Sequence, residues 1–136
     1  MGLKERRFTK TFQEETFPGL KQQIDTAAGF EVEMLIEWET LFEESFVHLY
    51  QDSYPKIYFI PLIEAFKAIA SDSLGKEALR TSLQKVVINN QDNHHNPSSA
   101  YSFKEGVLEI NHSPILNADK VEDRIEVLTE LLENNL

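Results

Sequence analysis

The sequence predicts an α+β protein: a small, mostly antiparallel sheet of about four strands packed by helices on one side, with a C-terminal helix after a β-hairpin. Three observations predict it. Residues 101–110 have the pattern of a hairpin, the predicted elements run in the order helices, strand, helices, three strands and helix, and 41% of the residues are hydrophobic. No linker or internal repeat divides the 136 residues, so we expect a single α+β domain over residues 1–136.

The hairpin is the most specific local pattern. The dipeptide Glu105-Gly106 separates two alternating runs, and a two-residue turn there pairs Tyr101 with Ile110 and Phe103 with Leu108. This register places all four apolar side chains on one face, and a shift by one residue would divide them between the faces. Because an isolated hairpin is marginal in water, its apolar face must pack on other elements.

The N-terminal segment is predicted to be helical in two pieces that end before Gly29, since glycine favours a helix C-terminus. Phe8, Phe12 and Phe17 fall near one face of this region. Pro18 restarts the helix, because proline is tolerated in a first turn. The phenylalanines either pack on the core or bind a partner, and the sequence leaves both open.

Residues 30–39 alternate between apolar and acidic side chains and predict the clearest strand of the chain. Trp38 and the other apolar residues face one way, and Leu35 alone interrupts the acidic face. We expect the acids on a solvated outer face, where they also discourage edge-to-edge aggregation. The acidic face consists of Glu31, Glu33, Glu37 and Glu39.

Three helices are predicted between the first and second strands. Thr40 and Glu43 have the spacing of a capping box, which predicts a helix over residues 41–51. Apolar periodicity predicts two more, over residues 57–70 and 74–83. The second strand follows at residues 86–90, and the order of the strands within the sheet is left open.

The last helix has an apolar stripe opposite a row of glutamates. Like charges four residues apart cost a few tenths of a kcal/mol each, so packing of the stripe must hold this helix. The stripe consists of Val121, Ile125, Leu128 and Leu132, and the glutamates include Glu122, Glu126 and Glu130. The predicted core contains Trp38, Phe66, Phe103, Leu108, Ile110 and Ile125.

Charge excludes several classes of partner. The chain carries 13 Lys and Arg against 23 Asp and Glu, for a net charge of −10 at pH 7. We therefore expect no nucleic acid or anionic membrane partner. No apolar run approaches the ~20 residues of a membrane span. The absence of cysteine fits a reducing compartment, so we expect a soluble, cytoplasmic protein.

The sequence contains no catalytic or cofactor motif on which an enzyme could be based. There is no cysteine nucleophile, no G-x-S-x-G elbow and no glycine-rich phosphate loop. We therefore expect no cofactor, and a non-enzymatic protein is favoured over an enzyme. The sequence resembles no family closely enough to name one.

The loop over residues 91–99 offers an alternative. Asp92, His94 and His95 lie in it, and His112 ends the hairpin. A hairpin would bring these residues to one end of the sheet, where a His/His/Asp set can hold zinc with an open position. The alternative function is therefore a metal-binding module or a metal-dependent enzyme built on these four residues.

The favoured function is a protein-interaction module with an acidic surface. Residues 30–52 carry seven acids and no base, which suits a basic protein partner in an immunity-like or adaptor role. The candidate binding residues are the glutamates of the first strand and the last helix, while the oligomeric state is left open.

Overall fold

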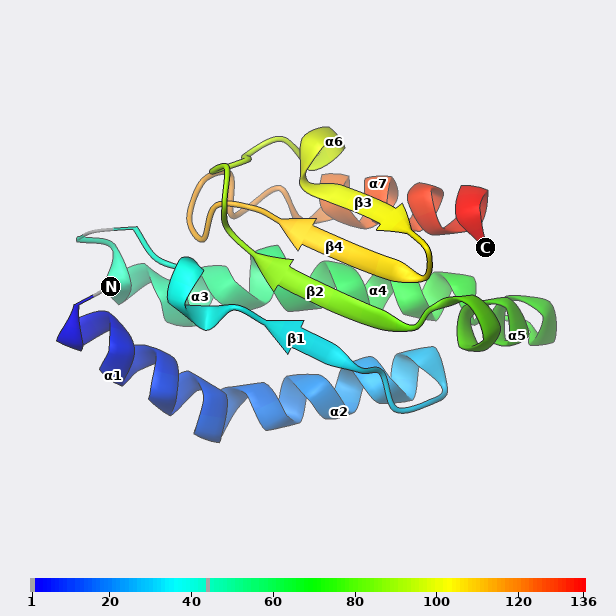
Figure 1. The fold of residues 1–136 in the computed structure, drawn as a ribbon, viewed down its shortest axis with the longest axis horizontal. Helices are drawn as coiled ribbons and strands as arrows, with labels where there is room; N and C mark the ends of the chain where they lie inside the picture. The colour runs from blue at the N-terminus through cyan, green and yellow to red at the C-terminus, as the bar shows by residue number, and fades with distance from the viewer. Residues whose placement is uncertain (1, 44) are drawn as a thin grey trace.

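The computed structural model describes residues 2–43 and 45–136. It has two layers, with one sheet and a layer of helices behind it (Figure 1). In chain order the helices are α1 (Leu3–Thr11), α2 (Phe17–Ala28), α3 (Tyr50–Tyr54), α4 (Ile60–Ile69), α5 (Ser73–Ser82), α6 (Pro97–Ala100) and α7 (Val121–Asn135), and the strands are β1 (Met34–Ile36), β2 (Lys85–Asn89), β3 (Tyr101–Lys104) and β4 (Val107–Asn111).

The sheet is mixed, so the prediction of a mostly antiparallel sheet is wrong. Its order is β1-β2-β4-β3, in which β2 is parallel to both β1 and β4, and only β3 and β4 are antiparallel. The helical connection from β1 to β2 carries the chain back to the end where β1 began, which makes this pair parallel. β4 then enters between β2 and β3. The α+β class, the four strands and the final helix are confirmed.

The hairpin has the predicted register. Tyr101 pairs with Ile110 and Phe103 with Leu108. Glu105 and Gly106 both have positive φ, of 52° and 81°, as a tight two-residue turn requires. A Cβ at Gly106 would lie 2.8 Å from the Gln84 side chain, so this glycine is also needed for close packing.

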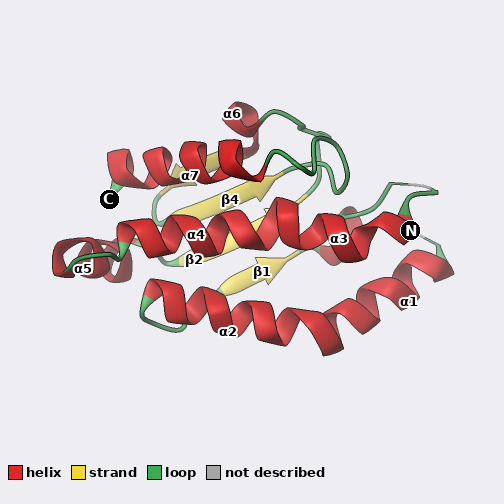
Figure 2. Ribbon diagram, turned by 180° about the vertical axis from the view of Figure 1, so that it is seen from behind, coloured by secondary structure: helices red, strands yellow, loops and turns green. Residues whose placement is uncertain are grey.

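Helices cover only one face of the sheet. Seen from behind, α2, α4 and α7 lie side by side across the strands (Figure 2). The covered face carries fully buried apolar side chains from the two central strands, and no helix of the described chain lies over the opposite face (Figure 1). These buried side chains are Val86, Ile88, Leu108 and Ile110.

The N-terminal phenylalanines pack inside the protein. Phe12 is 1% exposed, and its ring meets Tyr54 edge-on at 5.3 Å between centroids. Phe8 and Phe17 are half-buried against the same aromatic cluster, in which Phe17 contacts Trp38. Of the two alternatives left open by the sequence, the structure selects internal packing.

Each of the two long helical regions contains a π-helical turn just before a proline. Phe12–Thr16 precedes Pro18, and Pro55–Phe59 precedes Pro61. Proline lacks the N–H that an α-helix needs, and the wider turn shifts the bonding so that the N–H of Phe17 reaches the carbonyl of Phe12. The helices therefore continue through both prolines.

Residues 30–51 differ most from prediction. β1 has three residues where a strand over residues 30–39 was expected, because residues 38–40 turn away as a 3-10 helix. The helix predicted to begin at residue 41 starts only at Val47, as a 3-10 turn over Val47–Leu49 that leads into α3, and Glu44 lies outside the described residues. The Thr40 hydroxyl bonds the carbonyl of Glu37 and the N–H of Asn90, so it caps no helix.

The core contains most of the predicted residues. Phe66, Leu108 and Ile110 are at most 1% exposed, while Trp38 and Phe103 are half-buried against them. Ile125 is the exception. Helix α7 instead buries Arg124, Leu128 and Leu132. Arg124 thus takes the place on the buried face that the predicted stripe gave to Ile125.

Truncating the hairpin face should be costly. Leu108→Ala or Ile110→Ala removes a fully buried side chain from the centre of the sheet, so each should lower the free energy of unfolding by ~2–5 kcal/mol. Urea unfolding followed by circular dichroism measures the loss. A loss below ~0.5 kcal/mol at both positions would contradict the internal position of this face.

Candidate functional site

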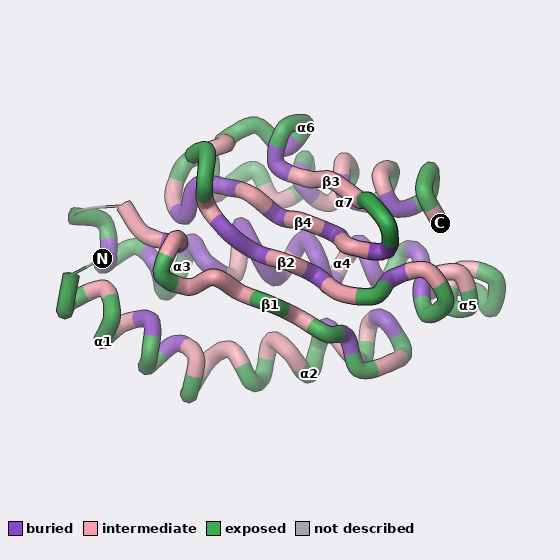
Figure 3. Tube along the Cα trace, viewed as in Figure 1, coloured by how far each residue is buried: buried purple, intermediate pink, exposed green. Residues whose placement is uncertain are grey.

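The uncovered face of the sheet is half-polar. Side chains of a strand alternate between faces, so β2 presents Lys85, Val87 and Asn89 there, and β4 presents Val107 and Glu109. Leu35 of β1 lies in the same row as Val87 and is 49% exposed. Figure 3 shows exposed and half-buried residues along β1, in contrast to the buried segments of β2.

The acids around β1 lie on the outside, as predicted. Glu31, Glu33 and Glu39 are exposed and Glu37 is half-buried, whereas Val32 between them is 1% exposed. None of the four glutamates forms an ion pair with Lys or Arg in the part of the chain that the structure describes. Their carboxylates are therefore free of direct ion pairs, and Lys85 is the cationic residue that lies in the row of Glu33.

The glutamates of α7 form a separate surface. Glu122, Glu126 and Glu130 are exposed, as predicted. Helix α7 packs against α4 and β3, whereas β1 lies at the opposite edge of the sheet (Figure 2). The two sets therefore lie at different edges of the protein, and each can be changed without the other.

One hydrogen bond marks a polar centre on the uncovered face. Asn89 is 2% exposed, and its Nδ2 donates to Oε2 of Glu109 at 3.2 Å. The Oδ1 of Asn89 has no hydrogen-bond partner among the described residues. A buried acceptor without a donor is costly, and this oxygen is itself almost fully enclosed by the protein.

The ends of β1 and β2 carry a polar network and a shallow hollow of about 580 Å³. Asn93 Nδ2 donates to Glu43 Oε1 at 3.4 Å, and Asn111 Nδ2 donates to Asp92 Oδ2 at 2.8 Å. Asn93 also exchanges two bonds with Asn90 within the loop. These amides fix the path of the loop against the ends of the strands.

The predicted metal ligands are only partly brought together. Asp92 Oδ2 lies 3.8 Å from Nε2 of His94. The backbone carbonyl of His94 accepts from Ser113 and that of His95 accepts from Asn117, so both histidines also serve the loop through their backbones. No group of three or more His, Asp or Glu side chains that could hold a metal ion occurs within residues 2–43 and 45–136.

His112 is buried and belongs to a different cluster. Its Nδ1 lies 2.6 Å from the carbonyl oxygen of Ser113, so that nitrogen carries the proton and Nε2 is left as an acceptor. Arg124 directs its Nε toward this Nε2 at 3.4 Å. Burial, aided by the charge of Arg124, lowers the pKa of His112 to about 4 and keeps the ring neutral at pH 7.

Arg124 has no carboxylate partner in the described structure. Its guanidinium donates to the carbonyls of Ala118 and Asn117, and burial lowers its pKa below the usual value. The sequence did not point to this residue, because arginine is seldom fully buried. Its position three residues after Val121 and four before Leu128, on one helical face, was the available signal.

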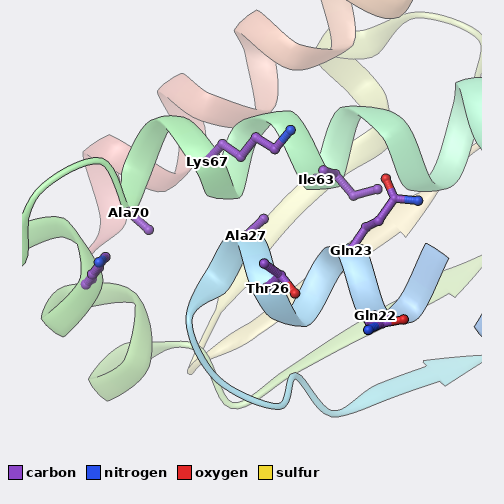
Figure 4. Close-up of a pocket in the computed structure, with 8 residues that line it drawn as sticks. Gln22, Gln23, Thr26, Ala27, Ile63, Lys67 and Ala70 are labelled. Carbon is purple, nitrogen blue, oxygen red and sulfur yellow. The ribbon is translucent and has the colours of Figure 1, made fainter. Parts of the chain in front are cut away.

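A groove of about 560 Å³ lies on the helical layer, between α2, α4 and α5 (Figure 4). It is lined by Gln22, Gln23, Thr26, Ala27, Ile63, Lys67, Ala70 and Lys76. The polar ends are spread along the helices without meeting at one point (Figure 4), and Lys67 is engaged with Glu64 at 3.4 Å. The groove therefore has no arrangement that suggests chemistry.

Comparison with protein families, with curated proteins and with solved structures found no match for this chain. Within the described residues, no helix combines the length and the apolar character needed to cross a membrane. The uncovered sheet face and the acids of its β1 edge are the features of this chain that bear on its function.

Proposed function

We propose that this protein binds a basic protein through the uncovered face of its sheet and the acids beside β1, without catalysis of its own. The observation that carries the proposal is the set of carboxylates without direct ion pairs at this edge, next to a sheet face that no helix of the described chain covers. An immunity-like or adaptor role is the concrete form of this function.

The chemistry of the surface favours recognition over turnover. Leu35, Val87 and Val107 provide apolar area at the centre, and the glutamates supply charge at the rim, which is the usual layout of a protein interface. Opposite charge on the partner accelerates the encounter and gives specificity. Among the described residues, the metal alternative has the single pair Asp92–His94 in its favour.

Reversing charge at β1 should abolish binding, while the same change on α7 should not. The test variant is Glu33→Lys with Glu37→Lys, and the matched control is Glu122→Lys with Glu126→Lys, which changes the net charge equally. Extracts of the source cell are passed over the immobilised wild type and both variants, and retained proteins are identified by mass spectrometry.

We expect a basic protein that the wild type and the α7 variant retain and the β1 variant loses, with an association rate that falls as salt shortens the Debye length below ~10 Å. Melting temperatures should stay close to that of the wild type, because Glu33, Glu122 and Glu126 are exposed, Glu37 is half-buried without an ion pair, and charges at such positions contribute little to stability. Retention of the same proteins by the wild type and both variants would contradict the proposal.

A further inference from the structure

We propose that the free edge of β1 receives an extended segment rich in Lys or Arg as a fifth strand of the sheet. This inference rests on the proposed function and specifies how the basic partner is held. It adds to charge a second source of affinity, the backbone hydrogen bonds of a sheet edge.

Within the part of the chain that the structure describes, the backbone of β1 is paired on one side only. The carbonyl of Glu33 accepts from Val86, and the N–H of Glu37 donates to Ile88. Because both backbone groups of a strand residue point the same way and alternate along the strand, Met34 and Ile36 direct theirs away from β2. β1 lies at the end of the sheet order, with β2 as its one neighbour, so these groups face a vacant strand position.

Charge decides which strand can occupy this position. A second copy of the chain, paired antiparallel about Leu35, would set Glu33 of one copy against Glu37 of the other, and like charges directly opposite destabilise a strand pair. A segment with Lys or Arg on alternate residues would instead face these glutamates with opposite charge. The charges at this edge therefore disfavour pairing with a second copy of the chain and favour pairing with a basic segment.

The polar centre of the uncovered face also favours a cationic side chain. Asn89 follows Ile88, the partner of Ile36, and so lies in the row of Glu37. Its Nδ2 holds the half-buried Glu109 carboxylate on this face, which adds negative charge. An arginine that reaches across β1 from the added strand carries five N–H donors, which suit a carboxylate.

The test uses the full chain, labelled with ¹⁵N, and a short capped peptide in which lysine alternates with valine. A second peptide has the same sequence with alternate backbone amides methylated, which preserves charge and removes strand pairing. A third replaces lysine with glutamate. Amide exchange and chemical shifts are followed by NMR for the wild type and for the Glu33→Lys, Glu37→Lys variant.

We expect the lysine peptide to slow amide exchange at Met34 and Ile36 on the order of tenfold at saturation, and the methylated and glutamate peptides not to do so. If the methylated peptide binds the wild type as well as the lysine peptide does, and the charge-reversed variant binds neither, the fifth strand is overturned and the proposed function stands. No response at β1 to the lysine peptide would also overturn it. Concentration-dependent protection of Met34 and Ile36 without peptide would replace it with a second copy of the chain.

Discussion

Lowering the pH from 7 to 4 is expected to destabilise the protein through His112 by up to about 3 kcal/mol, in addition to any loss from its carboxylates. The folded chain holds the pKa of His112 at about 4, against 6.5 for the unfolded chain. Between these values the unfolded chain binds the proton and the folded chain does not. The contribution is therefore fully present above pH 6.5 and is lost as the pH falls toward 4.

The surroundings of His112 explain the size of this effect. The ring is 0% exposed, and its free Nε2 faces the Arg124 guanidinium, so a proton there would put two positive groups in contact in the core. His94 and His95 act in the same direction from the loop. No other element supplies a carboxylate to this cluster in the described structure.

Two measurements check this prediction. An NMR titration should give the His112 ring a midpoint near pH 4. Urea unfolding at pH 7 and pH 4.5 should show a smaller loss for His112→Gln than for the wild type, whereas His48→Gln, at an exposed position, should behave as the wild type. Identical losses for the wild type and His112→Gln would show that this histidine does not titrate in the window.

Removing Arg124 should cost more than removing the isoleucine beside it. Arg124→Ala leaves the carbonyls of Asn117 and Ala118 and the Nε2 of His112 without their donor. The unpaired buried nitrogen of His112 costs ~1–3 kcal/mol, and removal of a fully buried side chain leaves a cavity, so the total loss of unfolding free energy should be about 3–5 kcal/mol. Ile125 is only half-buried, and Ile125→Ala should cost roughly 1–2 kcal/mol, less than a full core truncation.

Urea unfolding of both variants at pH 7 makes the comparison, with Arg124→Lys as a third variant. A lysine ammonium cannot reproduce the fork that reaches three acceptors, so it should recover less than half of the loss. A larger loss for Ile125→Ala than for Arg124→Ala would mean that α7 is rotated from the observed position and that the sequence-based stripe is correct.

The features that sequence predicts well here are local ones. The hairpin register follows from Glu105-Gly106 and the alternation of the next few residues, and Gly29 ends α2 in the left-handed conformation. The parallel pairing of β1 with β2 depends on contacts between residues far apart in the chain, which alternation does not encode. The capping box at Thr40 failed for the same reason, because Asn90 from a distant loop uses its hydroxyl.

For the candidate site, too, the sequence predicted the local features and missed those that depend on distant contacts. Alternation alone placed Glu31 and Glu33 outside and Val32 inside. It did not reveal that the sheet face beside them is uncovered, because this depends on where the helices pack. The predicted metal cluster is not formed because the His112 side chain is turned inward to Arg124. The sequence did not reveal this contact, since arginine is usually exposed.

The order of the strands also affects how the chain avoids aggregation while it folds. The chain between Val86 and its β4 partner Leu108 is less than half as long as that between Val86 and its β1 partner Met34. Because shorter connections lose less entropy on closing, we expect β2 and the hairpin to assemble while the other edge of β2 is still unpaired. That edge runs through Val86, Val87 and Ile88, an apolar β-branched segment prone to intermolecular pairing. When β1 pairs with β2 in this order, it covers this aggregation-prone apolar edge, and the sheet then ends in a strand flanked by acids.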